Sequence, residues 1–114
     1  MQKKVFISQP MNGRTYDQIL EERKAVVTDL RAHGLDVIDS VFKTTQDEES
    51  GNYALACLGR SFEMLSLADI ALFLPGWQYA RGCWMEHEAC IRYGIPIVYA
   101  QREESTKEER HGQA

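Results

Sequence analysis

The chain has 114 residues, 44% of them hydrophobic and 26% charged, which fits one globular domain and is too short for two. Its net charge of −4 and its lack of a Lys/Arg cluster argue against polymeric nucleic acid as a partner. The longest strongly apolar run, residues 70–74, is far shorter than the roughly 20 residues of a membrane span, and no signal peptide opens the chain, so we expect a soluble, cytoplasmic protein without a membrane partner.

The first part of the chain predicts a strand, a long helix and a second strand. Residues 5–7 form a short apolar run, as expected of a strand that is buried on both faces. Thr15 and Gln18 have the spacing of a capping box. Behind this box, apolar residues recur at a helical period until a glycine can end the helix, which predicts a helix over residues 16–33. Residues 35–38 predict the second strand.

The second part of the chain predicts two further helix–strand units. A polar loop, residues 43–52, comes first and has the composition of a mobile segment or lid. Helical spacing then predicts a helix over residues 53–67, followed by a wholly apolar strand over residues 70–74. A helix over residues 83–93 and a strand over residues 95–99 complete the pattern.

This alternation of strands and helices predicts an α/β fold with a parallel sheet. We expect a flavodoxin/Rossmann-like, doubly wound sheet of about four strands in the order 2-1-3-4, with helices on both faces. Residues 1–100 would form this domain, and residues 101–114 a polar tail. Ligands of such sheets bind where the winding reverses, here between the first and third strands. The loops over residues 8–14 and 75–82 should therefore converge.

The first loop precedes a helix, whose amino end favours an anion such as a phosphate. Its candidate binding residues are Ser8, Gln9, Pro10, Met11, Asn12, Gly13 and Arg14. The pattern is neither a P-loop nor a GxGxxG motif, so a simple chain reversal remains the alternative. Asp39 ends the second strand at the same edge of the sheet and is a further candidate for contact with the substrate or for acid–base work.

The second loop combines aromatic residues, an arginine and glycines. Its candidate binding residues are Gly76, Trp77, Arg81 and Gly82. Trp77 and Tyr79 could stack on a heterocyclic base or a sugar, and Arg81 could hold a phosphate or a carboxylate. The alternative is that the aromatic residues cap the edge of the core or fill a contact between subunits.

Glu86 is the candidate catalytic residue. It follows the second loop near the start of a predicted helix, where the helix dipole should keep its carboxylate ionised. An ionised carboxylate at this edge can act as a nucleophile or a general base. Glu88 lies two residues further on and cannot face the same site. A glutamate that only compensates the helix dipole is the alternative interpretation.

We expect neither a metal site nor another cofactor. Cys83, His87 and Cys90 share one helical stripe, but metal sites usually draw ligands from a second segment as well. Buried cysteine is common as a small apolar residue. The three cysteines are odd in number and lie in predicted helices, so reduced thiols are expected rather than disulfides.

Several of these motifs resemble a known family, the nucleoside 2-deoxyribosyltransferase superfamily. The resemblance rests on Gly82-Cys83-Trp84-Met85-Glu86, on Ala89, and on Gly94-Ile95-Pro96 at the family's spacing. The opening segment Phe-Ile-Ser-Gln-Pro-Met-Asn-Gly, residues 6–13, is most similar to small phage and bacterial members. Together these segments cover about residues 3–99.

The resemblance implies that Glu86 matches the family's nucleophile, which attacks the anomeric carbon of a (deoxy)ribosyl group. The chain would then be an N-glycosidic bond hydrolase or a deoxyribosyltransferase acting on a (deoxy)nucleoside 5′-monophosphate or a nucleoside. The family's Asp-Ser-Gly-Thr is replaced by Ala80-Arg81-Gly82-Cys83, and Arg81 favours a nucleotide. Family members complete their sites across a subunit interface, so a homo-oligomer is expected. The alternative is a module that binds a nucleotide without turning it over.

Overall fold

Four strands alternate with helices along the chain, as the sequence predicts. The computed structural model describes residues 2–39 and 52–101, so the predicted lid, apart from its last residue, and the tail from residue 102 onward lie outside the described residues. The elements, in chain order, are β1 (Lys4–Ser8), α1 (Tyr16–Ala32), β2 (Asp36–Ile38), α2 (Tyr53–Leu65), β3 (Ile70–Phe73), a 3₁₀ helix (Trp77–Tyr79), α3 (Arg81–Tyr93) and β4 (Ile97–Tyr99).

The strands form one parallel sheet in the order β2-β1-β3-β4, which is the predicted order. β1 lies in the middle and pairs with two neighbours, so that Val5 is opposite Val37 on one side and Ile70 on the other. β4 pairs with β3 and forms an edge. The chain therefore has the doubly wound, Rossmann-like α/β fold.

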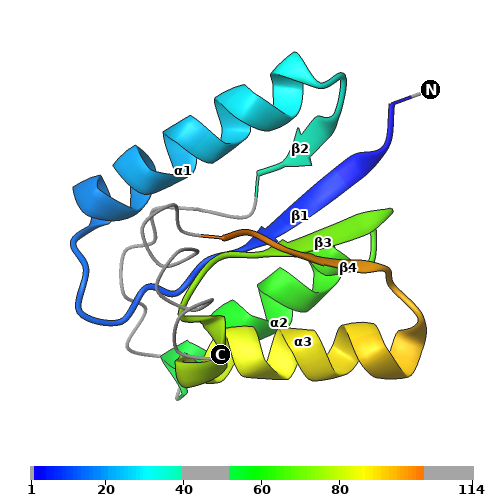
Figure 1. The fold of residues 1–114 in the computed structure, drawn as a ribbon. Helices are drawn as coiled ribbons and strands as arrows, with labels where there is room; N and C mark the ends of the chain where they lie inside the picture. Colours follow the sequence, from blue (N-terminus) through cyan, green and yellow to red (C-terminus); the bar gives the residue numbers. More distant parts are fainter. Residues whose placement is uncertain (1, 40–51, 102–114) are drawn as a thin grey trace, which may run out of the picture.

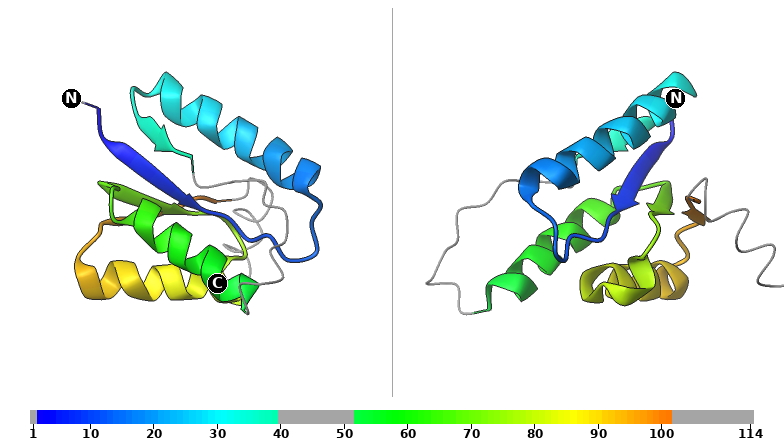
Figure 2. Two further views of the ribbon diagram at one scale, coloured as in Figure 1. Left: turned by 180° about the vertical axis from the view of Figure 1, so that it is seen from behind. Right: turned by 60° about the vertical axis from the view of Figure 1, so that its left-hand side comes forward.

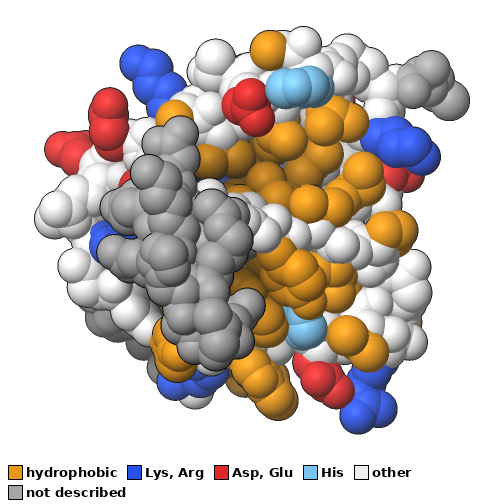
Figure 3. Space-filling model, in the orientation of Figure 1, with side chains coloured by type: hydrophobic (Ala, Val, Ile, Leu, Met, Phe, Trp, Pro, Cys, Tyr) orange, Lys and Arg blue, Asp and Glu red, His pale blue; other side chains and the backbone are white. Residues whose placement is uncertain are grey.

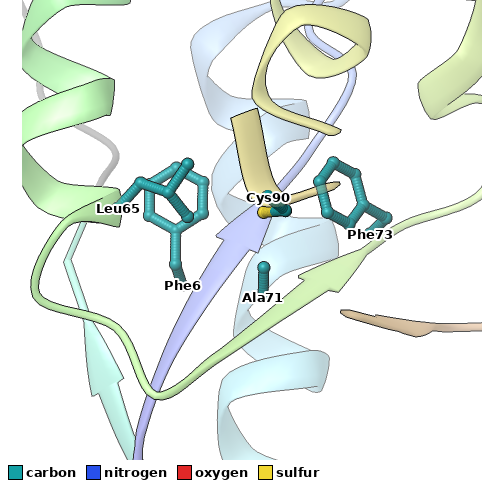
Figure 4. Close-up of a cluster of buried hydrophobic side chains, with 5 residues drawn as sticks. All are labelled: Phe6, Leu65, Ala71, Phe73 and Cys90. Carbon is teal, nitrogen blue, oxygen red and sulfur yellow. The ribbon is translucent and has the colours of Figure 1, made fainter. Parts of the chain in front are cut away.

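Helices cover both faces of this sheet, α1 on one side and α2 and α3 on the other (Figures 1 and 2). Because side chains alternate along a strand, each strand contributes to two separate cores. The core beneath α1 contains Val5, Ile7, Leu72 and Leu74, against which Val26, Val27 and Leu30 pack. The core on the other side contains Phe6, Leu65, Ala71, Phe73 and Cys90 (Figure 4).

The long helix α1 begins at the predicted capping box. Thr15 accepts a hydrogen bond from the Gln18 amide at 3.1 Å, and the Gln18 side chain accepts one from the Thr15 amide at 2.9 Å. These two bonds satisfy amides that the first turn of a helix leaves without partners. The helix ends at Ala32, one residue before the predicted end, and Gly34 has the left-handed φ of 81° that allows the chain to turn into β2.

Three elements, α3, α2 and β4, each differ from their predicted bounds by two residues at one end. α3 begins at Arg81 rather than at Cys83, because Ala80 already has the extended backbone of an N-cap and Trp84 bonds back to its carbonyl at 2.9 Å. α2 ends at Leu65 rather than at residue 67, since the chain tightens into i→i+3 bonds such as Leu67 to Met64. β4 starts at Ile97, two residues later than predicted.

Within the described ranges, no helix is long and apolar enough to cross a membrane.

Candidate functional site

A cavity of about 380 Å³ lies beside the carboxyl end of β1, between that strand, α2 and the start of α3. Three parts of the chain line it: the end of β1 with its following loop, one face of α2, and the segment that leads into α3. The lining residues are Phe6, Ile7, Gln9, Met11, Asn12, Leu58, Ser61, Tyr79, Ala80, Arg81, Gly82, Cys83 and Glu86. The cavity therefore lies at the predicted switch point, where the two loops converge.

Glu86 is the acidic group of this cavity among the described residues. Its side chain is 7% exposed, although α3 as a whole lies on the surface. The hydroxyl of Ser8, the last residue of β1, donates a hydrogen bond to Glu86 Oε1 at 2.7 Å. This bond connects the end of the central strand to α3 across 78 positions of sequence. The fold thus positions a carboxylate at the edge of the sheet with one oxygen already bound.

The ionisation of Glu86 differs from the prediction. Burial raises the pKa of Glu86 from 4.5 to about 7, while the hydroxyls of Ser8 and Ser61 act in the opposite direction. The sequence analysis considered only the helix dipole, which would help to keep the carboxylate ionised, and it placed Glu86 near the start of its helix. With α3 starting at Arg81, Glu86 lies in the second turn, beyond the range in which the dipole is strong, and desolvation dominates.

The amino end of α3 faces the same cavity. Its N-cap, Ala80, offers no side-chain acceptor, so no side chain caps the first amides of the helix. Arg81 and Gly82 line the cavity at this end, and the Arg81 side chain is exposed. Amides at a helix start together with a guanidinium form a site suited to an anionic group.

Gln9 is a buried polar residue on the wall of the cavity. Its Nε2 donates to the Ile19 carbonyl at 3.0 Å and to the Glu22 carboxylate at 3.1 Å. Because both partners are acceptors, they fix which end of the amide is the nitrogen. Its Oε1 is buried and has no hydrogen-bond partner among the described residues, although Gln9 is only 4% exposed. Gln9 therefore carries an unused acceptor beside the cavity.

The two aromatic residues of the second loop are placed differently. Tyr79 lines the cavity and is 84% exposed, so its ring is available at the rim. Trp77 is not among the residues that line this cavity; it stacks on His87 and packs against Phe73 and Tyr99 instead. The structure thus places Trp77 as a packing residue, as in the alternative interpretation, and Tyr79 as the aromatic residue at the rim of the cavity.

The remaining residues of the first loop lie on the α1 side of the crevice. Pro10, Arg14 and Gly76 line a separate cavity of about 520 Å³, and Arg14 with Gly13 lines another. Arg14 donates to the Pro10 carbonyl at 2.6 Å and lies 3.4 Å from the Glu22 carboxylate. The predicted binding set is therefore divided, and Glu86 shares its cavity with Gln9, Met11, Asn12, Arg81 and Gly82.

Three other carboxylates have different surroundings. Asp39 follows β2 and is exposed, and its charge acts on the pKa of the buried Arg23. Glu88 pairs with Arg92 at 2.7 Å, which confirms that it does not face the Glu86 site. Asp69 accepts a hydrogen bond from the Lys4 amide at 2.8 Å, at the opposite end of the sheet. None of these three lines the cavity of Glu86 in the described part of the chain.

The cysteine and histidine residues of α3 do not converge on a common point. His87 bonds through Nε2 to the Tyr99 hydroxyl at 2.6 Å, on the side of α3 that faces β4. Cys83 and Cys90 are buried, and burial raises the pKa of each thiol to about 11. Across residues 2–39 and 52–101, no group of three or more His, Cys, Asp or Glu residues could hold a metal ion.

The chain was compared with protein families, with curated proteins and with solved structures. A family model described as "Domain of unknown function (DUF4406)" matches residues 3–99. The chain belongs to this family. The comparison with curated proteins found no match. A solved structure, "Crystal structure of conserved protein from Enterococcus faecalis V583", is similar to 96% of this chain and 74% of its own, with 15% sequence identity and a TM-score of 0.66. This likeness shows the fold.

In this DUF4406 chain, the cavity also contains residues that the sequence analysis missed. Leu58 and Ser61 reach it from α2, which had been interpreted only as a core helix. A signal was present in their spacing, because residues three apart share one face of a helix. Ser61 is a polar residue on that face, and its hydroxyl acts to lower the pKa of Glu86. The sequence alone does not show that α2 crosses the end of β1, so it could not place Ser61 at the cavity.

Proposed function

We propose that the protein cleaves the N-glycosidic bond of a (deoxy)nucleoside 5′-monophosphate or a nucleoside, with Glu86 as the nucleophile. The observation that carries this proposal is the buried Glu86 carboxyl in a cavity at the switch point, held by the Ser8 hydroxyl at 2.7 Å. The cavity of about 380 Å³ is within the usual range of small-molecule sites. The resemblance of the Glu86 segment to the deoxyribosyltransferase superfamily supports the same assignment.

The proposed reaction has two steps. In the first, an oxygen of ionised Glu86 bonds to C1′ of the sugar while the bond from C1′ to the base nitrogen breaks. The electron pair leaves with the base, which takes a proton from water. In the second, water attacks C1′, loses a proton and releases the Glu86 carboxylate, which gives a hydrolase; attack by a nitrogen of another base gives a transferase. A fixed carboxylate suits the oxocarbenium-like transition state of both steps.

A nucleotide is favoured over a nucleoside by the amino end of α3. Arg81 and the first amides of the helix face the cavity that contains Glu86, without a side-chain cap to occupy them. A 5′-phosphate carries the charge and the acceptor oxygens that such a site binds. Tyr79 at the rim supports a stacking contact with the base or sugar.

The direct test is incubation with a panel of ribo- and deoxyribonucleoside monophosphates, with chromatography of the released base. We expect base release by the natural chain and none above background by Glu86→Gln. Glu88→Gln is the matched control, because Glu88 is on the same helix and pairs with Arg92 outside the cavity. Equal release by the natural chain and Glu86→Gln would contradict the enzymatic assignment.

A second candidate function is the binding of a nucleotide without turnover. The raised pKa of Glu86, about 7, favours it, because much of the carboxyl is protonated at neutral pH and a protonated carboxyl is a poor nucleophile. A ligand at 100 times its dissociation constant stabilises a protein by about 2.7 kcal/mol. Thermal stabilisation by a nucleotide that is recovered intact would support this function over catalysis.

We also propose that the chain acts as a homo-oligomer in the cytoplasm. Hydrophobic side chains form a band on the face where β4 is the edge of the sheet (Figure 3), and Val98 and Tyr99 of that strand are about half exposed. Trp84, also half exposed, adds a large apolar surface on α3. The free thiols of its cysteines suit a reducing compartment. A monomeric mass at micromolar concentration in light scattering would contradict the oligomer.

A further inference from the structure

The hydroxyl of Ser8 is a hydrogen-bond donor that the central strand holds in place beside Glu86. It donates to Glu86 Oε1 at 2.7 Å, and Ser8 is only 1% exposed. The backbone of Ser8 pairs with β3, because Ser8 is opposite Phe73 and its carbonyl accepts a hydrogen bond from the Leu74 amide at 3.0 Å. The sheet therefore fixes where this donor lies relative to α3.

The two oxygens of the Glu86 carboxyl have different surroundings. Oε1 is bonded to Ser8, which is not among the residues that line the cavity, whereas Glu86 itself lines it. The terminal torsion of a glutamate is broad, so without this bond the carboxyl plane could turn and exchange its oxygens. The bond thus holds one oxygen behind the cavity wall and leaves the other for the cavity.

We propose that Ser8 is a positioning residue that gives the two oxygens of Glu86 different tasks: it holds Oε1, so that Oε2 is the oxygen that attacks C1′ of the sugar. This inference rests on the proposed function and deepens it. In the attack, Oε2 bonds to C1′ while the bond from C1′ to the base nitrogen breaks. The electron pair leaves with the base, which takes a proton from water. Ser8 keeps its own proton, since a hydroxyl donates to a carboxylate oxygen that only accepts.

The charged and titratable groups around Glu86 do not perform this task. Those groups are Tyr79, Arg81, Cys83 and Cys90. Burial raises the pKa of each of the two thiols to about 11, so both are neutral. Arg81 is exposed at the start of α3. In the described part of the chain, β1 and α2 bring no charged side chain to the cavity wall, so the Ser8 hydroxyl is the group fixed on the carboxyl.

The loss of this donor should change both the titration and the turnover of Glu86. A hydrogen bond to a charged group changes its ionisation equilibrium by roughly tenfold or more. The midpoint of the Glu86 titration should therefore rise by about one pH unit in Ser8→Ala. Where base release is measurable, kcat should fall and its acid limb should move upward. KM should change little, because Ser8 does not line the cavity.

The test is a titration of Glu86 by NMR with ¹³C-labelled glutamate side chains, in which the Glu86 signal is assigned from its absence in Glu86→Gln. Ser8→Ala should raise the midpoint, and Ser8→Cys, which nearly keeps the size of the side chain but is a weaker donor, should raise it less. Val5→Ala is the matched control, because Val5 is buried on the same strand but packs in the core beneath α1. It removes packing without removing a donor, so its midpoint should equal that of the natural chain.

An unchanged midpoint in Ser8→Ala would overturn the proposal, and so would an equal rise in Val5→Ala, which would assign the effect to a loosened strand. Ser8→Cys decides in the same way if the alanine variant does not fold. A raised midpoint with an undiminished kcat at alkaline pH would refute the different tasks of the two oxygens. The titration needs no turnover: a raised midpoint without base release refutes the proposed function, and base release with an unchanged midpoint refutes the role of Ser8.

Discussion

The indole of Trp77 lies stacked on the imidazole of His87, with ring centroids 4.1 Å apart and planes inclined by 18°. His87 also bonds to the Tyr99 hydroxyl at 2.6 Å, and Phe73 packs edge-on against both Trp77 and His87. These contacts tie the 3₁₀ helix after β3 to α3 and to β4. Because Ala80 and Arg81 follow directly on this 3₁₀ helix, the cluster fixes where the cavity wall begins.

Trp77→Ala should therefore lower the free energy of unfolding by about 2–4 kcal/mol, since it removes a large ring from a packed cluster. Trp84→Ala is the matched control, because Trp84 is 52% exposed on α3 and its loss should change the free energy by about 0.5 kcal/mol or less. Urea denaturation of the two variants measures both values. A similar loss in both would mean that the cluster has no special role.

Glu86→Gln should change how stability depends on pH. The folded pKa of Glu86, about 7, is above its ordinary value of 4.5, so between these pH values the folded chain holds a proton that the unfolded chain has lost. Stability from this group therefore falls as pH rises from 4.5 to 7, by about 3 kcal/mol, and then stays constant. Glutamine does not titrate, so the variant should lack this decline.

Urea denaturation of the natural chain, Glu86→Gln and Glu88→Gln at acidic and mildly alkaline pH checks this expectation. Glu86→Gln should gain relative to the natural chain on the alkaline side. Glu88→Gln should keep the decline, because Glu88 is on the surface of α3 and pairs with Arg92. An identical pH dependence in the natural chain and Glu86→Gln would show that Glu86 does not titrate abnormally.

Arg81→Ala should weaken the binding of a nucleoside monophosphate by about tenfold or more, because a charged hydrogen bond contributes about 1.5–3 kcal/mol. The same change should have little effect on the corresponding nucleoside, which lacks the phosphate. Arg92→Ala is the control, since Arg92 is in the last turn of the same helix and pairs with Glu88. Isothermal titration with both ligands gives the comparison, and equal losses for nucleotide and nucleoside would refute a phosphate contact.

Thr15→Ala should lower the free energy of unfolding by about 1 kcal/mol, the usual effect of losing an N-cap. The variant loses the bond from the Gln18 amide and with it half of the capping box. Thr28→Ala makes the same chemical change at an exposed interior position of α1, where alanine is the better helix former, so it should be neutral or slightly stabilising. Chemical denaturation separates the two, and equal effects would contradict the cap.

The fold was predictable because the sequence pattern of each strand and helix agreed with the alternating strand–helix order of the whole chain. The short apolar runs of β1 and β3 indicated strands buried on both faces, and the capping box fixed the start of α1. The boundaries of α3 and β4 were less accurate. Residue 82 was assigned to the preceding loop, yet Gly82 lies inside the first turn of α3, because the extended backbone of Ala80 already ends the preceding 3₁₀ helix.

The site was predictable in position but not in composition. Strand order alone brought the end of β1 and the start of α3 together, and with them Ser8 and Glu86. The contribution of α2 depends on how that helix crosses the sheet, which no periodicity encodes, so Ser61 was missed. The ionisation of Glu86 depended on a shift of two residues in the start of its helix and on burial, neither of which the spacing revealed.

The central place of β1 also has a consequence for how the chain acquires its structure. β1 is the first strand to be synthesised, but its neighbour β3 comes much later, as the bond from the Lys4 amide to Asp69 shows, which spans 65 positions. Pairings of such long range make folding slow, because closing the long intervening loop costs entropy before the new contacts can compensate for it. Both cores share β1, so a nascent chain cannot complete either until β3 has emerged from the ribosome. Until then, the side of β1 that pairs with β3 stays without its partner strand.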